Sequence, residues 1–224
     1  MPVQEFQTAM RTQESILSRA EKKALIWMAE RMPAAINSDH LTLLSLVAMI
    51  GAGAAYWAAG TNLQWLWAVN ACIILNWAGD SLDGTLARVR RRQRPRYGFY
   101  VDHLIDCVGA VALLGGLGWS GIMSLREAVI LLLVYLMLSI ESYLATYTLG
   151  HFQLSHFGFS PTELRLLLIA GNITLFFRRD VNIFGWTHPL FDFGAWCGIA
   201  GMAFLLVYSA IRNTARLYAQ EKLS

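Results

Sequence analysis

The chain has 224 residues, of which 56% are hydrophobic and 15% are charged, and its mean hydropathy is +0.43. This composition excludes an ordinary soluble domain, whose residues are less apolar and more often charged. The net charge of +3 is a poor guide to partners, because the placement of the charges along the chain is more informative than their sum.

The first segment, from about Thr12 to Met32, predicts an amphipathic helix at the membrane interface. A helix packed on the protein's own surface explains the pattern equally well. Pro33 would end this helix, and we assign residues 1–40 to an N-terminal cytoplasmic or interfacial segment. The expected apolar face consists of Leu17, Ala20, Ala24, Trp27 and Met28.

Six apolar stretches follow, and each approaches the roughly 20 residues that a helix needs to cross a bilayer. Their expected ranges are 41–60, 63–86, 98–118, 125–149, 161–177 and 190–212. The fifth is short and patchy, so its limits are the least defined. The sequence therefore predicts an all-α membrane protein, in which residues 41–217 form one domain of six transmembrane helices and residues 218–224 form a C-terminal tail.

The cationic residues predict the orientation of these spans. With six spans and an inner N-terminus, fifteen Lys and Arg residues lie on the inner side and three, Arg126, Arg178 and Arg179, on the outer side. This excess predicts that both chain ends face the cytoplasm. Six of the inner arginines lie between Arg88 and Arg96. Because two spans flank them, we expect contacts with lipid headgroups or phosphates rather than with nucleic acid.

Four carboxylates mark the cytoplasmic ends of the second and third spans. Asp80 and Asp83 are three residues apart, and Asp102 and Asp106 are four apart, so each pair shares a helix face. The Arg- and Pro-containing stretch between them predicts antiparallel, neighbouring helices whose acidic pairs converge. Carboxylates near a bilayer are costly and are usually functional. Four of them suit two Mg²⁺ or Mn²⁺ ions, which prefer oxygen ligands and could clamp a diphosphate.

Small residues between the aspartates leave room for a flat ligand. Gly84 and Ala87 leave one helix face almost bare, and Gly98 does the same on the facing helix. Arg88 follows Gly84 by one turn and could contact a phosphate. An aspartate that is not fully engaged by metal could deprotonate an attacking hydroxyl.

These residues resemble the signature of the CDP-alcohol phosphotransferases, D-x2-D-G-x2-A-R-x8/9-G-x3-D-x3-D, at all eight of its positions. The resemblance implies six membrane helices, a homodimer and a cytoplasm-facing site with two metal ions. It implies metal ligation by Asp80, Asp83 and Asp102, with Asp106 also at the metals as the general base. Asp83, Gly84, Ala87, Arg88 and Gly98 would border the CDP part of the donor. The implied reaction is a transfer of a substituted phosphate group, of class EC 2.7.8, with release of CMP.

The donor and the acceptor remain open at this stage. One branch of the family uses CDP-diacylglycerol with a polar alcohol, and another uses a CDP-amino alcohol with diacylglycerol. Thr146 and Tyr147, followed by Thr162 and Glu163, resemble a segment of the second branch. Candidate contacts to the acceptor or to a headgroup are Glu141, Glu163 and Arg165.

Two other functions compete with this assignment. An intramembrane prenyltransferase also uses Asp-rich helices and Mg²⁺, but it does not require the Asp-Gly-x2-Ala-Arg pattern. A divalent-cation transporter would need acidic residues along several spans to the far side, whereas here they gather at one end of two spans. The CDP-alcohol phosphotransferase remains the main prediction.

Overall fold

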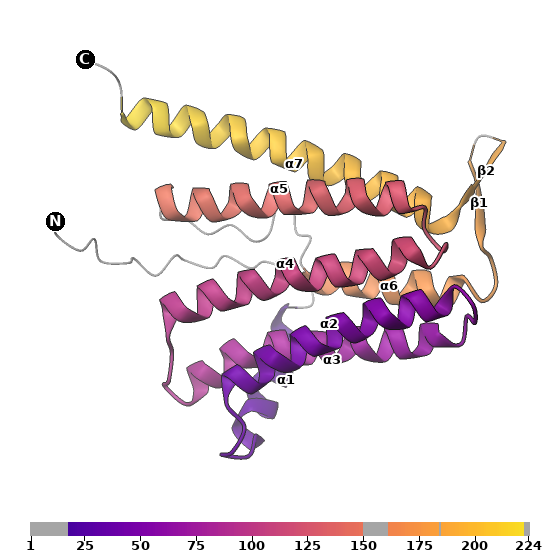
Figure 1. Ribbon diagram of the computed structural model, residues 1–224. Helices are drawn as coiled ribbons and strands as arrows, with labels where there is room; N and C mark the ends of the chain where they lie inside the picture. Colours follow the sequence, from indigo (N-terminus) through magenta and orange to yellow (C-terminus); the bar gives the residue numbers. More distant parts are fainter. Residues whose placement is uncertain (1–17, 150–160, 184, 222–224) are drawn as a thin grey trace.

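The computed structural model describes residues 18–149, 161–183 and 185–221, and it consists of long helices with one small hairpin (Figure 1). No structural statement below extends to the other residues, which include Leu17 of the expected amphipathic face. The elements are α1 (Ser18–Arg31), α2 (Ser38–Ala59), α3 (Trp65–Val89), α4 (Pro95–Trp119), α5 (Leu125–Leu149), α6 (Pro161–Thr174), β1 (Asp180–Ile183), β2 (Trp186–Pro189) and α7 (Leu190–Gln220).

Four of the described helices, α2, α4, α5 and α7, are long and apolar enough to cross a membrane. The expected second and fifth spans also form helices, α3 and α6, but they fall outside this group. α3 is long, yet its two asparagines and two aspartates, together with Ser81, Thr85 and Arg88, lower its hydropathy. α6 has 14 residues, or about 21 Å at 1.5 Å per residue, which is shorter than a bilayer core of about 30 Å.

A two-stranded hairpin joins α6 to α7, where the sequence analysis named no strand. β1 and β2 pair antiparallel, with Asp180 opposite Pro189 and Ile183 opposite Trp186. Gly185 has a φ of +86°, a left-handed conformation that glycine adopts without strain. Strands of four residues are too short to show a clear alternation of apolar and polar residues, so the sequence pattern did not predict this hairpin.

Helix α2 packs extensively against both α3 and α4, whereas α3 and α4 pack little on each other. The two helices run antiparallel, as expected (Figure 1), but most of their packing is with α2 rather than with each other. Two glycines explain why α4 packs closely on α2. A methyl group added at Gly53 or Gly116 would overlap the backbone of the opposite helix. Without a side chain at these positions the α2 and α4 backbones approach closely, which is typical of membrane helices.

Three buried polar side chains attach α6 to this layer. The Tyr56 hydroxyl of α2 donates to Asn172 Oδ1 of α6 at 2.8 Å. Asn172 Nδ2 in turn donates to Asn70 Oδ1 of α3 at 2.8 Å. All three residues are buried. Because these two hydrogen bonds lie within the apolar interior, they fix how α6 is rotated against α2 and α3.

Helix α1 lies within the expected N-terminal segment and ends before Pro33, but a different face from the expected one is buried. Leu25 and Ala29 are buried and pack against Leu41, Leu82 and Leu86. Ala24 and Trp27, expected on the apolar face, are exposed, and Met28 is half-buried. The described part of α1 is therefore attached to the protein's own surface.

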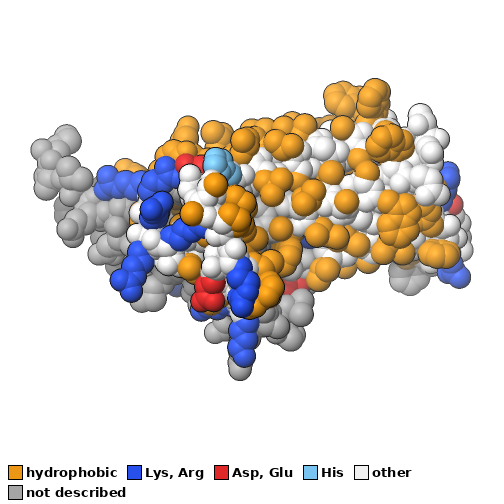
Figure 2. Space-filling view, turned by 90° about the horizontal axis from the view of Figure 1, so that it is seen from below, with side chains coloured by type: hydrophobic (Ala, Val, Ile, Leu, Met, Phe, Trp, Pro, Cys, Tyr) orange, Lys and Arg blue, Asp and Glu red, His pale blue; other side chains and the backbone are white. Residues whose placement is uncertain are grey.

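Charged and apolar side chains separate along the molecule. Figure 2 shows Lys and Arg side chains gathered at the end where α3 joins α4, and hydrophobic side chains over most of the remaining surface. α5 and α7 pack against each other at the periphery, and most of their apolar residues are not buried. The three cysteines, Cys72, Cys107 and Cys197, are free. This separation suits a molecule whose apolar middle faces lipid.

Candidate metal centre and nucleotide cavity

Three of the four predicted aspartates converge. Asp80 of α3 and Asp102 and Asp106 of α4 each offer one carboxylate oxygen, and these three oxygens lie within 4.8 Å of one another. The two α4 residues are one helical turn apart, so both face α3 without a bend in the helix. The predicted convergence of acidic residues from two helices is therefore confirmed for these three.

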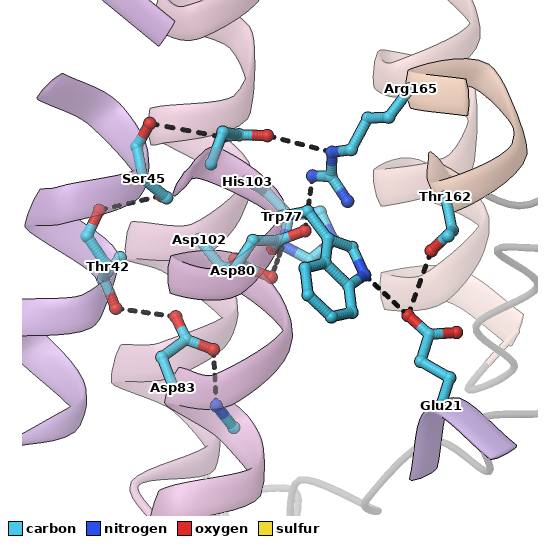
Figure 3. A network of polar contacts seen from close by, with 12 residues as sticks. Glu21, Thr42, Ser45, Trp77, Asp80, Asp83, Asp102, His103, Thr162 and Arg165 are labelled. Atoms are coloured by element: carbon cyan, nitrogen blue, oxygen red, sulfur yellow. Dashed lines mark hydrogen bonds and ion pairs between the residues drawn. The ribbon is translucent and has the colours of Figure 1, made fainter. Parts of the chain in front are cut away.

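Asp83 lies outside this group, among the residues that the structure describes, and contacts α2 instead. Its Oδ2 accepts a hydrogen bond of 2.7 Å from the Thr42 hydroxyl, and its Oδ1 accepts one from the Gly84 backbone N–H. Figure 3 shows its carboxylate turned toward Thr42. The metal-ligand role of Asp83 stays a prediction, and the sequence gave no indication of Thr42.

Arg165 links the acidic cluster to α6. Its Nη2 donates to Asp80 Oδ2 at 2.6 Å, and its Nε donates to Asn76 Oδ1 at 2.9 Å (Figure 3). Asn76 Nδ2 continues the chain to the Ser45 carbonyl oxygen of α2 at 3.1 Å. The guanidinium of α6 therefore contacts two residues of α3, and Asn76 extends this network to α2.

The motif's glycines border open space. A methyl group added at Gly98 would meet nothing within 4 Å, and one at Gly84 would meet only the flexible end of Arg88, at 3.4 Å from Nη1. Arg88 is exposed and donates to Thr85 Oγ1 at 3.0 Å. The predicted room for a flat ligand beside α3 and α4 is present at both glycines.

A cavity of about 370 Å³ opens beside Ala87, between the start of α2 and the end of α3. Its cationic lining includes Arg90, Arg92 and Arg94. Arg90 also donates to the carbonyl oxygens of Met32 and Pro33 at 2.8 and 2.9 Å, so it fixes the chain after α1. The α2 side of this cavity, made by residues 37–39, was not foreseen because no motif marks it.

The two glutamates proposed for the acceptor lie in different settings. Glu141 of α5 accepts a hydrogen bond of 2.7 Å from Asn213 Nδ2 of α7, which is a contact between peripheral helices. Glu163 is half-buried in the first turn of α6, two residues before Arg165. Arg165 is therefore the candidate that directly touches the acidic cluster.

Glu21 of α1 joins the network, and no sequence signal distinguished it from an ordinary surface acid. Its Oε1 accepts hydrogen bonds from Trp77 Nε1 of α3 at 2.8 Å and from Thr162 Oγ1 of α6 at 3.2 Å (Figure 3). It lies three residues after the start of α1, next to the exposed Lys22 and Lys23. The N-terminal helix therefore reaches the helices that carry the site.

Together, an apolar helical layer, a carboxylate cluster and a cationic cavity at one end define a membrane protein with a candidate phosphate-transfer site. A sequence profile of the CDP-alcohol phosphatidyltransferase family matches residues 36–207. The chain belongs to this family of membrane transferases, and the resemblance drawn from the aspartate motif is confirmed. Family membership also sets the chain apart from the intramembrane prenyltransferases.

The fold has a relative among solved structures. A crystal structure of phosphatidylinositol phosphate synthase from Mycobacterium tuberculosis, with CDP-DAG bound, superposes with a TM-score of 0.62. The match covers 92% of this chain and 99% of that chain, at 17% sequence identity. At this identity the likeness shows a shared fold. No curated protein matches the chain by sequence.

Proposed function

We propose that the protein transfers a substituted phosphate group from a CDP-linked donor to the hydroxyl of an alcohol and releases CMP. The observation that carries this proposal is the meeting of Asp80, Asp102 and Asp106 within 4.8 Å, beside two glycines with open space. The product would be a phospholipid, because the site lies in an apolar helical bundle and one of the two substrates must be a lipid.

The acidic cluster is the proposed site for two divalent cations, Mg²⁺ or Mn²⁺. Ligand oxygens of a Mg²⁺ octahedron lie about 3.0 Å apart when adjacent and about 4.2 Å apart when opposite, so three oxygens within 4.8 Å of one another could close around an ion. Asp83 would complete the set after leaving Thr42. Bound divalent cations would neutralise the charge on the diphosphate of the donor.

The cavity beside Ala87 supports a site for the nucleotide of the donor. Gly84 and Gly98 would let the ligand approach the backbone of α3 and α4, and Arg88 would contact a phosphate. The arginines that line the cavity add positive charge where a diphosphate is expected. Together they would bind the CDP part and orient the phosphoryl group that is transferred.

Asp106 is the proposed general base. Its carboxylate would accept the proton of the acceptor hydroxyl as that oxygen attacks the phosphoryl group next to the donor's alcohol. The P–O bond to CMP breaks as the new P–O bond forms, so CMP leaves with the electron pair. Holding both reactants beside one carboxylate removes much of the entropic cost of the reaction.

The donor is either CDP-diacylglycerol or a CDP-amino alcohol. The bound CDP-DAG in the structurally similar synthase favours the first. Arg165 at the cluster, with Glu163 nearby and Glu141 farther along α5, forms the proposed acceptor side. A cation at this place suits an acceptor that carries a phosphate.

The proposed arrangement in the membrane has six transmembrane helices, α2 to α7, with the site open to the cytoplasm. The gathering of Lys and Arg at the end that carries the site supports this orientation (Figure 2). A homodimer is expected from the family. The boundaries at residues 40 and 217 stay predictions.

CMP release tests the proposed function. The purified protein would receive Mg²⁺ or Mn²⁺, one CDP-linked donor and a panel of alcohols. We expect CMP and a lipid product from one donor class, and neither after chelation of the metal. Ion flux in proteoliposomes without any CMP would contradict the proposal and favour the cation transporter.

A further inference from the structure

Two polar contacts connect α3 and α6 at successive turns. In the outer one, Glu21 Oε1 accepts hydrogen bonds from Trp77 and Thr162. In the inner one, Arg165 donates to Asp80. Asp80 follows Trp77 by three residues, and Arg165 follows Thr162 by three, so each helix carries its two contact residues about one turn apart (Figure 3).

The inner contact is a partly buried ion pair. The Arg165 side chain is 16% exposed and the Asp80 side chain is 24% exposed, with 2.6 Å between Nη2 and Oδ2. Water screens such a pair less than one on the open surface. The guanidinium therefore opposes the binding of any other cation that uses the Asp80 carboxylate.

The outer contact fixes the first turn of α6. The Tyr56, Asn172 and Asn70 triad already anchors the far end of this short helix. Thr162 lies in the first turn of α6, and its hydrogen bond to Glu21 attaches this end of α6 to α1. Trp77 donates to the same Glu21 carboxylate and so attaches α1 to α3. A helix held at both ends keeps Arg165 beside Asp80.

We propose that Glu21 is a positioning residue that holds the start of α6, so that Arg165 stays on Asp80 and shares this carboxylate with the bound divalent cation. The inference rests on the proposed function, because it assumes that Asp80 is a metal ligand. The proposal therefore predicts that the contact of the N-terminal helix lowers the affinity of the site for its metal ion. A merely structural role for Glu21 predicts the reverse, because a loosened site binds metal less well.

A double-mutant cycle on Mn²⁺ affinity tests the proposal. The dissociation constant of Mn²⁺ would be measured by electron paramagnetic resonance on purified wild type, Glu21→Ala, Arg165→Gln and the double variant. Each single variant is expected to bind Mn²⁺ about three- to tenfold more tightly, because a competing cation leaves Asp80. In the Arg165→Gln background, Glu21→Ala should change the constant by less than about twofold.

Two further variants control for folding and chemistry. Glu21→Gln keeps an oxygen that accepts both hydrogen bonds, so it should restore the wild-type constant. Thr162→Val removes the bond between α6 and Glu21 while Glu21 keeps its bond to Trp77, so it should reproduce Glu21→Ala and also serves if the alanine variant does not fold. Thr174→Val is the matched control in the same helix, because the exposed Thr174 hydroxyl donates to the Ala170 carbonyl oxygen at 2.8 Å within α6, and it should change nothing.

The outcomes separate this inference from the function on which it rests. Weaker Mn²⁺ binding in Glu21→Ala, or equal effects of Glu21→Ala with and without Arg165, would overturn the positioning role and leave the transferase proposal intact. A wild type that binds no Mn²⁺ would overturn both. A wild type that binds Mn²⁺ and shows the expected cycle, but releases no CMP, would support the positioning role and count against the transferase.

Discussion

The glycines of this protein fall into two regions with opposite surroundings. At the α2–α4 crossing, Gly53 and Gly116 face backbone so closely that a methyl group has no space. At the acidic site, Gly98 has nothing within 4 Å, and Gly84 has only a flexible arginine. The same residue type therefore serves close packing in one region and leaves room in the other.

This difference indicates what each region is for. A missing side chain at a helix crossing is explained by the close contact that it permits. A missing side chain beside open space does not serve packing, and at the acidic site a ligand that approaches the backbone would supply a reason for it. The comparison therefore separates glycines that permit close packing from glycines that would admit a ligand, and a substitution by alanine can probe both.

The largest effect is expected at the crossing. Gly116→Ala would place a methyl group on the Gly53 carbonyl, and the backbones must separate. We expect a loss of more than about 3 kcal/mol in the free energy of unfolding, above the usual range for overpacking. Thermal unfolding in detergent checks this. A variant as stable as the wild type would show that the crossing is not tightly packed.

A smaller and different effect is expected at the site. Gly98→Ala should leave the protein folded and slightly more stable, since alanine favours helices by about 1 kcal/mol over glycine. Because the added methyl group occupies ligand space, the apparent KM for the donor should rise about tenfold, which corresponds to about 1.4 kcal/mol. An unchanged KM would remove Gly98 from the donor site.

The smallest effect is expected in α7, where Gly201 also has nothing within 4 Å. It is exposed and belongs to a peripheral helix, far along the chain from the motif. Gly201→Ala should raise stability by up to about 1 kcal/mol and leave the donor KM unchanged. A tenfold rise in this KM would show that the Gly98 result does not report on the donor site.

The sequence predicted which acidic residues converge better than it predicted the packing of the helices. Residue spacing within one helix determines which side chains share a face, so the convergence of Asp80 with Asp102 and Asp106 was foreseen. How one helix rotates against another depends on many side chains at once. For that reason the sequence did not predict that α2 packs against both α3 and α4, or that Asp83 lies against Thr42.

Helix α1 illustrates the same limit. Periodicity predicted the helix, but assigned Ala24 and Trp27 to the apolar face, whereas Leu25 and Ala29 are the buried residues. Apolar side chains surround much of this helix, so its pattern fits more than one rotation. The correct rotation brings Glu21 to Trp77 and Thr162, and no local pattern in the sequence indicated this contact.

The most direct test of the central claim separates binding from chemistry at Asp106. Donor binding and CMP release would be measured on the same preparations of wild type and Asp106→Asn, with Mg²⁺ or Mn²⁺ present. The account predicts a fall in turnover of about 10²- to 10⁴-fold, with donor binding still measurable, because the amide cannot accept the proton of the acceptor hydroxyl. Full turnover in Asp106→Asn would contradict the account.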